Sequence, residues 1–224
     1  MPRNTPRASA RRPRVTRDRN RRILVICGGV RTEPEYLDYV NGRIRAVGVT
    51  IEIARSGRDP VSLVNEAIQK KRDESRRARA DNDSSNVYDA VWVMFDVDDF
   101  ASVIPDAIRL AAQNNIQWAI SNPCFEIWLL WHQQSHAAFV STGDIQRRTT
   151  GARVTAGANG KAIRHEALDG KYFDARARAL FADRLHREAD HKFPSDNPSS
   201  NVYVLIDSIL SGLSKSRPGE TIVL

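Results

Sequence analysis

Short apolar runs alternate along the first part of the chain with longer segments in which apolar residues recur every three or four positions. Apolar runs rich in Val and Ile are typical of strands buried on both faces. Four strands are predicted, at residues 23–27, 49–54, 89–95 and 116–121. Helices are predicted after each strand, at residues 32–48, from Asp59-Pro60 onward, at 104–115 and at 121–134. This alternation predicts an α/β fold, with a mostly parallel sheet covered by helices on both faces.

Residues 135–224 have a different character from this predicted core of residues 23–134. Residues 147–161 are polar and rich in glycine, which favours a loop or a flexible connector. Two helices are predicted further on, at residues 172–190 and 197–213. The first has a predicted apolar face of Phe173, Ala177, Leu180, Phe181 and Leu185. We expect a C-terminal helical extension that packs on the core or forms a small cap.

The positive charge of the chain is concentrated at its N-terminus. The net charge is +7, and residues 1–22 contain nine arginines and one aspartate, so the remainder is close to neutral. These 22 residues include three prolines and show no apolar period, which predicts a disordered basic arm. Such an arm can bind phosphate backbones without sequence preference. A solubilising tail, or a start codon assigned too early, explains the composition equally well.

Composition excludes several classes of protein. No apolar run approaches the ~20 residues that a membrane-spanning helix needs, and the charged N-terminus has no apolar segment typical of a secretory signal. Only two cysteines are present, Cys27 and Cys124, and neither belongs to a CxxC pair. This pattern argues against a disulfide framework or a zinc motif and favours a cytoplasmic protein. No membrane partner is expected.

Acidic residues follow the predicted strands where a ligand would bind. The stretch VWVMFDVDDF places Asp96 and Asp98 directly after the third predicted strand, while Glu33 and Glu126 follow the first and fourth. Carboxyl ends of parallel strands meet at one edge of a sheet, and carboxylates gathered there repel one another unless a cation joins them. We therefore predict a Mg²⁺ site, with Mn²⁺ as a possible substitute. Ordinary turn chemistry is the simpler interpretation of a DxD pair.

Neighbouring polar residues are weaker candidates. CGGVRTE lacks both common glycine-rich nucleotide-binding patterns, but its Arg31 is predicted to meet a phosphate. Ser121 and Asn122 are predicted to orient the edge by hydrogen bonds or to bind phosphate. Cys124 is expected to be a small buried residue, and His132, close to two tryptophans, is expected to pack in the core.

Four stretches of the chain together resemble the RloB-like proteins of bacteria. They are ILVICGGVRTEPEYL, VWVMFDVDDF, SNPCFEIWLLWH and NPSSNVYVLIDSIL, in that order, within residues 22–213. The resemblance implies a Toprim-like core, in which a Glu after the first strand and a later DxD hold Mg²⁺ for phosphodiester chemistry. It also implies a role in anti-phage defence, often beside an ATPase partner.

The resemblance assigns roles to residues and also exposes a departure. It implies that Asp96, Asp98 and Glu126 hold metal, and that Glu33 assists or acts as the base. The family pattern after the first strand usually reads Cys-Glu-Gly, whereas this chain has Cys27, Gly28 and Gly29. The carboxylate expected at position 28 is absent. Glu33, about one helical turn further on, is the residue that would replace it.

Three functional hypotheses follow. The first is a Mg²⁺-dependent nuclease of phage defence that acts on DNA or RNA, with a homodimer as one candidate assembly. The second is a non-catalytic subunit of a defence complex that binds nucleic acid. The third is a phosphotransferase of the HAD type, since FDVDD resembles that signature, although Phe100 stands where the signature has Thr or Val.

Overall fold

The computed structural model describes residues 20–44, 49–83, 86–157, 160–213 and 224. Most of the predicted basic arm, residues 1–19, lies outside the described residues. The first strand, β1 (Arg21–Cys27), begins two residues earlier than the apolar run predicts, so Arg21 and Arg22 belong to the sheet. No helix of the described chain is both long enough and apolar enough to cross a membrane.

The central sheet has five strands in the order β2-β1-β3-β4-β7. They are β1, β2 (Val49–Arg55), β3 (Ala90–Asp96), β4 (Gln117–Asn122) and β7 (Ser199–Ser200). The first four strands in this list are parallel to one another, which confirms the predicted mostly parallel sheet. The short β7 pairs antiparallel with β4. Its two serines were predicted to belong to the helix at 197–213, which begins only at Val202.

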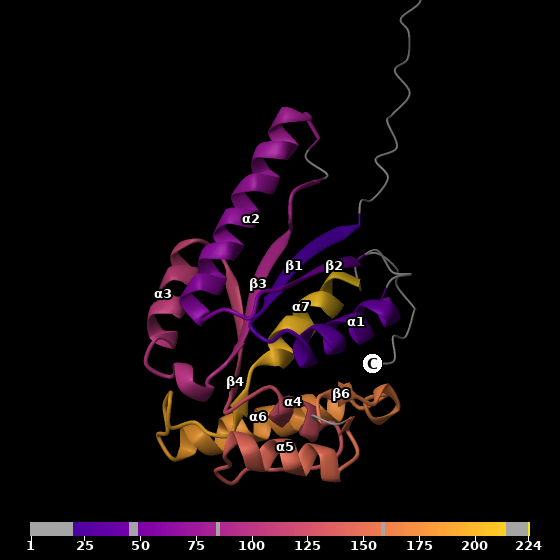
Figure 1. Ribbon diagram of the computed structural model, residues 1–224, viewed down its shortest axis with the longest axis vertical. Helices are drawn as coiled ribbons and strands as arrows, with labels where there is room; N and C mark the ends of the chain where they lie inside the picture. The colour runs from indigo at the N-terminus through magenta and orange to yellow at the C-terminus, as the bar shows by residue number, and fades with distance from the viewer. Residues whose placement is uncertain (1–19, 45–48, 84–85, 158–159, 214–223) are drawn as a thin grey trace, which may run out of the picture.

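Helices cover both faces of this sheet, as predicted (Figure 1). Residues of β1 alternate between the two faces, since Ile23 and Val25 belong to one apolar cluster and Leu24 and Ile26 to the other. Clusters on the two faces contain residues of different helices. The cluster with Ile23 and Val25 contains residues of α1 (Thr32–Ile44) and α7 (Val202–Leu213). The cluster with Leu24 and Ile26 contains residues of α2 (Pro60–Ala80) and α3 (Ile104–Gln113).

A further group of elements lies beyond the carboxyl ends of the parallel strands (Figure 1). It contains the helices α4 (Glu126–Trp131), α5 (Thr142–Gly151) and α6 (Tyr172–Glu188), and the short pair β5 (Thr155–Ala156) and β6 (Ala162–Ile163). Two short 3₁₀ helices complete the described elements, η3 (Asp98–Phe100) and η4 (His165–Ala167). These elements enclose the edge of the sheet where the acidic residues were predicted to meet.

Two further predictions about element boundaries are wrong. The helix predicted at 121–134 is confined to Glu126–Trp131, because β4 continues to Asn122. The segment 147–161 is not only a loop, because it contains the end of α5 and the strand β5.

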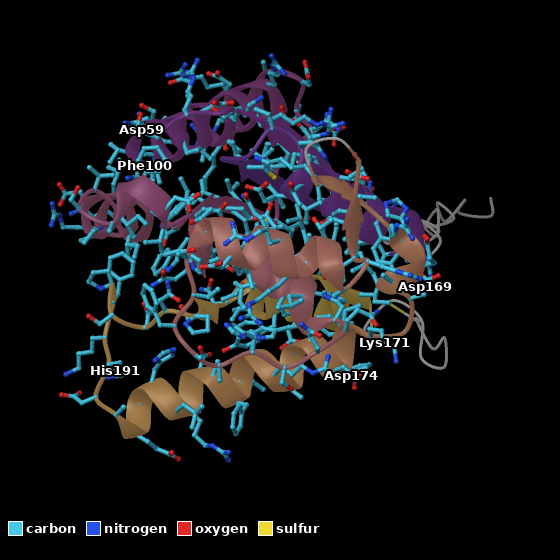
Figure 2. All side chains as sticks on the ribbon, turned by 60° about the horizontal axis from the view of Figure 1, so that its bottom comes forward. Asp59, Phe100, Asp169, Lys171, Asp174 and His191 are labelled. Carbon is cyan, nitrogen blue, oxygen red and sulfur yellow. The ribbon has the colours of Figure 1, made fainter. Side chains whose placement is uncertain are left out.

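Helix α6 is present, but it buries a different face from the one predicted. Figure 2 shows this helix along the outer surface, with Asp174 in its first turn and His191 just beyond its end. Phe173 is 70% exposed and Phe181 is 44% exposed. The buried residues include three alanines, Ala175, Ala179 and Ala182. Small side chains let α6 approach α4 closely, which the larger aromatic residues would prevent.

Candidate carboxylate cleft

The cleft forms where the order of the strands reverses along the chain. From β1 the chain passes through α1 to β2 on one side, and it then returns through α2 to β3 on the other side of β1. Ligands of open α/β sheets bind at the carboxyl ends of the strands at this kind of reversal, because the connecting segments diverge there. The Gly28 N–H donates to the Met94 carbonyl over 2.7 Å and fixes the end of β1 beside β3.

A cavity of about 180 Å³ lies at this edge. Among the residues that line it are four carboxylates from three separate parts of the chain, Glu33, Asp96, Asp98 and Glu126. All four were predicted as site residues, and the structure brings them together. Asp96 and Glu126 in particular face a common space, as the sequence hypothesis required. The convergence of acidic residues at one edge of the sheet is therefore confirmed.

Glu33 carries a carboxylate back to the tip of β1. It lies in the first turn of α1, is only 5% exposed, and accepts a hydrogen bond from the Gly29 N–H over 2.9 Å. A Cβ atom added at Gly29 would stand 2.0 Å from Glu33 Oε2. The carboxylate thus occupies the space that a side chain at position 29 would need, which explains why glycine suits this position.

Gly28, the site of the departure from the family pattern, faces a different environment. A Cβ atom added here would lie 3.2 Å from the Met94 carbonyl oxygen, and 3.4 Å from both Leu63 Cδ1 and Phe95 Cβ. Leu63 and Phe95 belong to the apolar cluster under α2 and α3. A side chain at position 28 would therefore start towards this apolar layer. Glu33 is the residue that brings a carboxylate to the end of β1.

The pKa of Asp96 is affected by the three other carboxylates of the cleft. Burial raises the pKa of Asp96 well above its usual range, and the carboxylates of Glu33, Glu126 and Asp98 raise it further. A backbone hydrogen bond with Phe125 opposes these effects. Burial also raises the pKa of Glu33, with a smaller contribution from Glu126. The charged forms of Asp96 and Glu33 are therefore destabilised, and a bound cation would stabilise them.

The other two carboxylates differ in exposure. Glu126 is the first residue of α4 and is 4% exposed, while Asp98 is exposed at the mouth of the cleft. Asp98 has a φ of 26°, which is uncommon for a residue with a side chain. Its backbone N–H donates to the Pro123 carbonyl over 3.0 Å, and its carboxylate accepts from the Thr142 hydroxyl. The loop after β3 is thereby attached to the segments that lead into α4 and α5.

Two cations line the same cleft, Arg31 and Lys161. Arg31 was predicted from its place beside the two glycines. Lys161 was missed, because the sequence places it at the end of a segment predicted to be a loop. The structure places Lys161 next to β6, where its charge offsets part of the rise in the pKa of Glu33. Its signal in the sequence was weak, since a single lysine after a glycine is common in loops.

Ser121 and Asn122, predicted as phosphate-binding residues, are engaged elsewhere. Ser121 is 2% exposed and its hydroxyl bonds to the Ser200 hydroxyl over 3.0 Å. The Asn122 amide donates to the Pro194 carbonyl and to Asp196. Neither residue lines the carboxylate cleft. Both residues attach β4 to the segment before α7. They therefore orient part of the fold by hydrogen bonds, as predicted, but outside the carboxylate cleft.

The remaining expectations concern two residues next to the cleft. Cys124 is 1% exposed and lines the cleft, and burial raises the pKa of its thiol. His132 is 2% exposed, its Nδ1 lies 3.0 Å from the Trp128 carbonyl, and burial lowers its pKa to about 4. Both expectations, a buried cysteine and a core histidine, are confirmed.

The donor set of the cleft matches the chemistry of Mg²⁺. Carboxylate oxygens are preferred ligands of this ion, which commonly uses one or two of them and retains several waters. Across the described residues, no three His, Cys, Asp or Glu side chains are already grouped in a way that could hold a metal ion. The four carboxylates line one cleft, but among the described residues they are not arranged as an assembled metal site.

These observations define the class of the protein, an α/β protein with a cleft of carboxylates at the carboxyl ends of a mostly parallel sheet. A family model described as RloB-like protein matches residues 23–209. The chain belongs to the RloB-like family. No curated protein matches the chain.

Proposed function

We propose that the protein is a Mg²⁺-dependent nucleic-acid phosphodiesterase. The observation that carries this proposal is the gathering of Asp96, Asp98 and Glu126 around one cleft whose negative charge is only partly balanced. In the proposal these three residues hold the ion. Bound Mg²⁺ would polarise a phosphate oxygen and favour ionisation of water.

The protein's own residues have distinct roles in this proposal. Arg31, exposed at the mouth of the cleft, binds a phosphate oxygen of the substrate. Glu33 accepts the proton of the attacking water, since burial has raised its pKa towards the range suited to a base. The positive charge of Lys161 favours the ionised form of Glu33. Membership of the RloB-like family supports placing this activity in anti-phage defence beside an ATPase partner.

The test is cleavage of labelled DNA and RNA by the purified protein, with Mg²⁺ or with EDTA. Asp96→Asn and Glu126→Gln preserve the shape of each side chain and remove its charge. We expect each to lower metal-dependent cleavage at least a hundredfold. Asp106→Asn is the matched control, because Asp106 lies on the exposed surface of α3 in an ion pair with Arg109.

Undiminished cleavage by a folded Asp96→Asn, Glu126→Gln double variant would rule the proposal out. The second hypothesis, a non-catalytic nucleic-acid-binding subunit, predicts binding without turnover with any divalent metal. That outcome would replace the first proposal with the second.

A further inference from the structure

The second half of α2 presents a row of cations on one face. Arg72, Arg76 and Arg79 are spaced by four and three residues, which places them on the same side of the helix. All three are exposed. The sequence indicates only a charged helix that projects into solvent, whereas the structure shows how its charges are sorted.

This row borders a groove between α2 and the end of α3. The groove has a volume of about 330 Å³, and its lining contains four cations, Lys71, Arg72, Arg76 and Arg79, and no carboxylate. The Lys71 ammonium donates to the carbonyls of Asn114 and Asn115, each over 2.9 Å, and so holds the two helices together. The groove is thus a built feature of the fold with a single sign of charge.

Most of the charge in the groove is free to meet a ligand. Among the described residues, Arg72 and Arg79 have no carboxylate partner, and Arg76 has only Asp73 at 3.5 Å with its own side chain 73% exposed. Exposed pairs of this kind contribute little energy. A polyanion would therefore displace few favourable contacts on binding here.

The start of β1 contacts the same helix, on a side of α2 that does not line the groove. Arg22 at the start of β1 pairs with Glu74 in the second half of α2 over 2.8 Å. Residues 1–19, which precede this point, contain seven more arginines and one aspartate. Figure 1 shows the second half of α2 extending past the sheet at the end where β1 begins, away from α4, α5 and α6. The seven residues of β1 separate this end from the carboxylate cleft by roughly 20 Å.

We propose that the groove of Lys71, Arg72, Arg76 and Arg79 is a binding surface for the phosphate backbone of nucleic acid, separate from the carboxylate cleft. Regularly spaced exposed arginines suit a chain of phosphates, because each contact releases condensed counterions. Binding at this surface does not depend on catalysis, so this proposal is independent of the proposed cleavage activity. In the full protein it anchors nucleic acid at the opposite end of the sheet from the cleft.

The test is fluorescence anisotropy of a labelled 20-nucleotide duplex DNA and a single-stranded RNA with the full chain. Binding is measured in EDTA, so that no metal-dependent turnover contributes, between 50 and 200 mM salt. The variant Arg72→Ala, Arg76→Ala, Arg79→Ala lowers affinity at least tenfold at the lower salt concentration. It also reduces the slope of log K against log salt by about 2 to 3, close to one per arginine.

Two controls isolate the groove from net charge and from folding. Arg109→Ala, Arg184→Ala, Arg187→Ala removes the same charge from α3 and α6 and leaves the slope unchanged. Replacing Arg72, Arg76 and Arg79 by lysine retains the charge and most of the slope. Equal losses in both alanine triples, or none in the groove triple, would overturn the proposal. Tighter binding of polyglutamate, dependent on the same arginines, would instead assign the groove to an acidic protein.

Discussion

Gly29→Ala is the sharpest test of how the cleft is built, because the added methyl group and the Glu33 carboxylate would compete for one space. The new Cβ would lie 2.0 Å from Oε2 and 2.3 Å from Oε1 of Glu33. Real Cβ atoms essentially never approach a heavy atom within 3.0 Å, so one group must move. The end of the Glu33 side chain is flexible, and the backbone is not. We expect the carboxylate to leave and the backbone to stay.

The change in stability should be small. Departure of the carboxylate removes its 2.9 Å hydrogen bond with the Gly29 N–H, a loss of about 1.5 to 3 kcal/mol for a charged group. The carboxylate regains hydration, and alanine restricts the unfolded chain by about 0.4 to 1 kcal/mol relative to glycine. We expect a free energy of unfolding within about 1 kcal/mol of the wild-type value, measured by denaturant titration. Such a change moves the melting temperature by about 2 to 4 °C.

The change in function should be large. Under the proposed mechanism, Gly29→Ala lowers metal-dependent cleavage about a hundredfold or more, as Glu33→Gln does, because both remove the base from the cleft. The double variant should be no worse than either single variant, since both act through one carboxylate.

Gly42→Ala is the control, because it makes the same substitution at a glycine away from the cleft. Position 42 lies inside α1, and apart from the adjacent residues and the backbone of its own helix nothing lies within 4 Å of the added methyl group, so alanine should stabilise the protein by about 1 kcal/mol. Full cleavage by Gly29→Ala, alongside loss in Glu33→Gln, would refute the reasoning. So would destabilisation by more than about 3 kcal/mol, which would show that the backbone has moved.

Three further predictions concern stability. Asp59→Ala should cost about 1 kcal/mol in denaturant titrations, because the Asp59 carboxylate accepts hydrogen bonds from two backbone N–H groups at the start of α2; an unchanged value would contradict that cap. Burial lowers the pKa of His132 to about 4, so the unfolded state binds more protons between pH 6.5 and 4 and stability falls as pH falls through that range. Between pH 7 and pH 5, protonation of His132 in the unfolded state should lower the free energy of unfolding by about 2 kcal/mol. His132→Gln should abolish this loss, and a loss of the same size in that variant would disprove the assignment to His132. Phe173→Ala should change the free energy of unfolding by less than about 0.5 kcal/mol, because Phe173 is exposed, whereas Ala179→Leu should lower it by about 1 to 3 kcal/mol, because Ala179 is buried. A larger loss in Phe173→Ala than in Ala179→Leu would favour the buried face predicted from sequence.

The parts of the fold that the sequence predicts are those with a strong local period. The strand 23–27 is a continuous apolar run, and the structure confirms it as β1 with both neighbours parallel. Helix α6 shows where period alone fails. Its phenylalanines and its alanines both recur at helical spacing, and the choice between the two faces depends on how closely α4 lies. That distance is a property of the tertiary structure and leaves no mark in the segment itself.

The carboxylates of the cleft were predictable for a different reason. Glu33, Asp96 and Glu126 each lie just after a predicted strand, and a parallel sheet brings such positions to one edge whatever the details of the helices. Lys161 comes from a connecting segment whose course depends on the pairing of β5 with β6, so no strand position indicated it. The same distinction applies to Ser121 and Asn122. Their positions at the end of β4 were correct, but the unpredicted strand β7 uses the Ser121 hydroxyl.

The departure at Gly28 changes meaning once the space around it is known. The resemblance to the family pattern marks position 28 as a place where a carboxylate is missing, because a sequence pattern considers the chain one position at a time. The structure shows that a side chain at position 28 would start towards Leu63 and Phe95, while Glu33 already occupies the space beside Gly29. A carboxylate is therefore present at the tip of β1, supplied from one helical turn later. Glycine at position 29 is what makes that arrangement sterically possible.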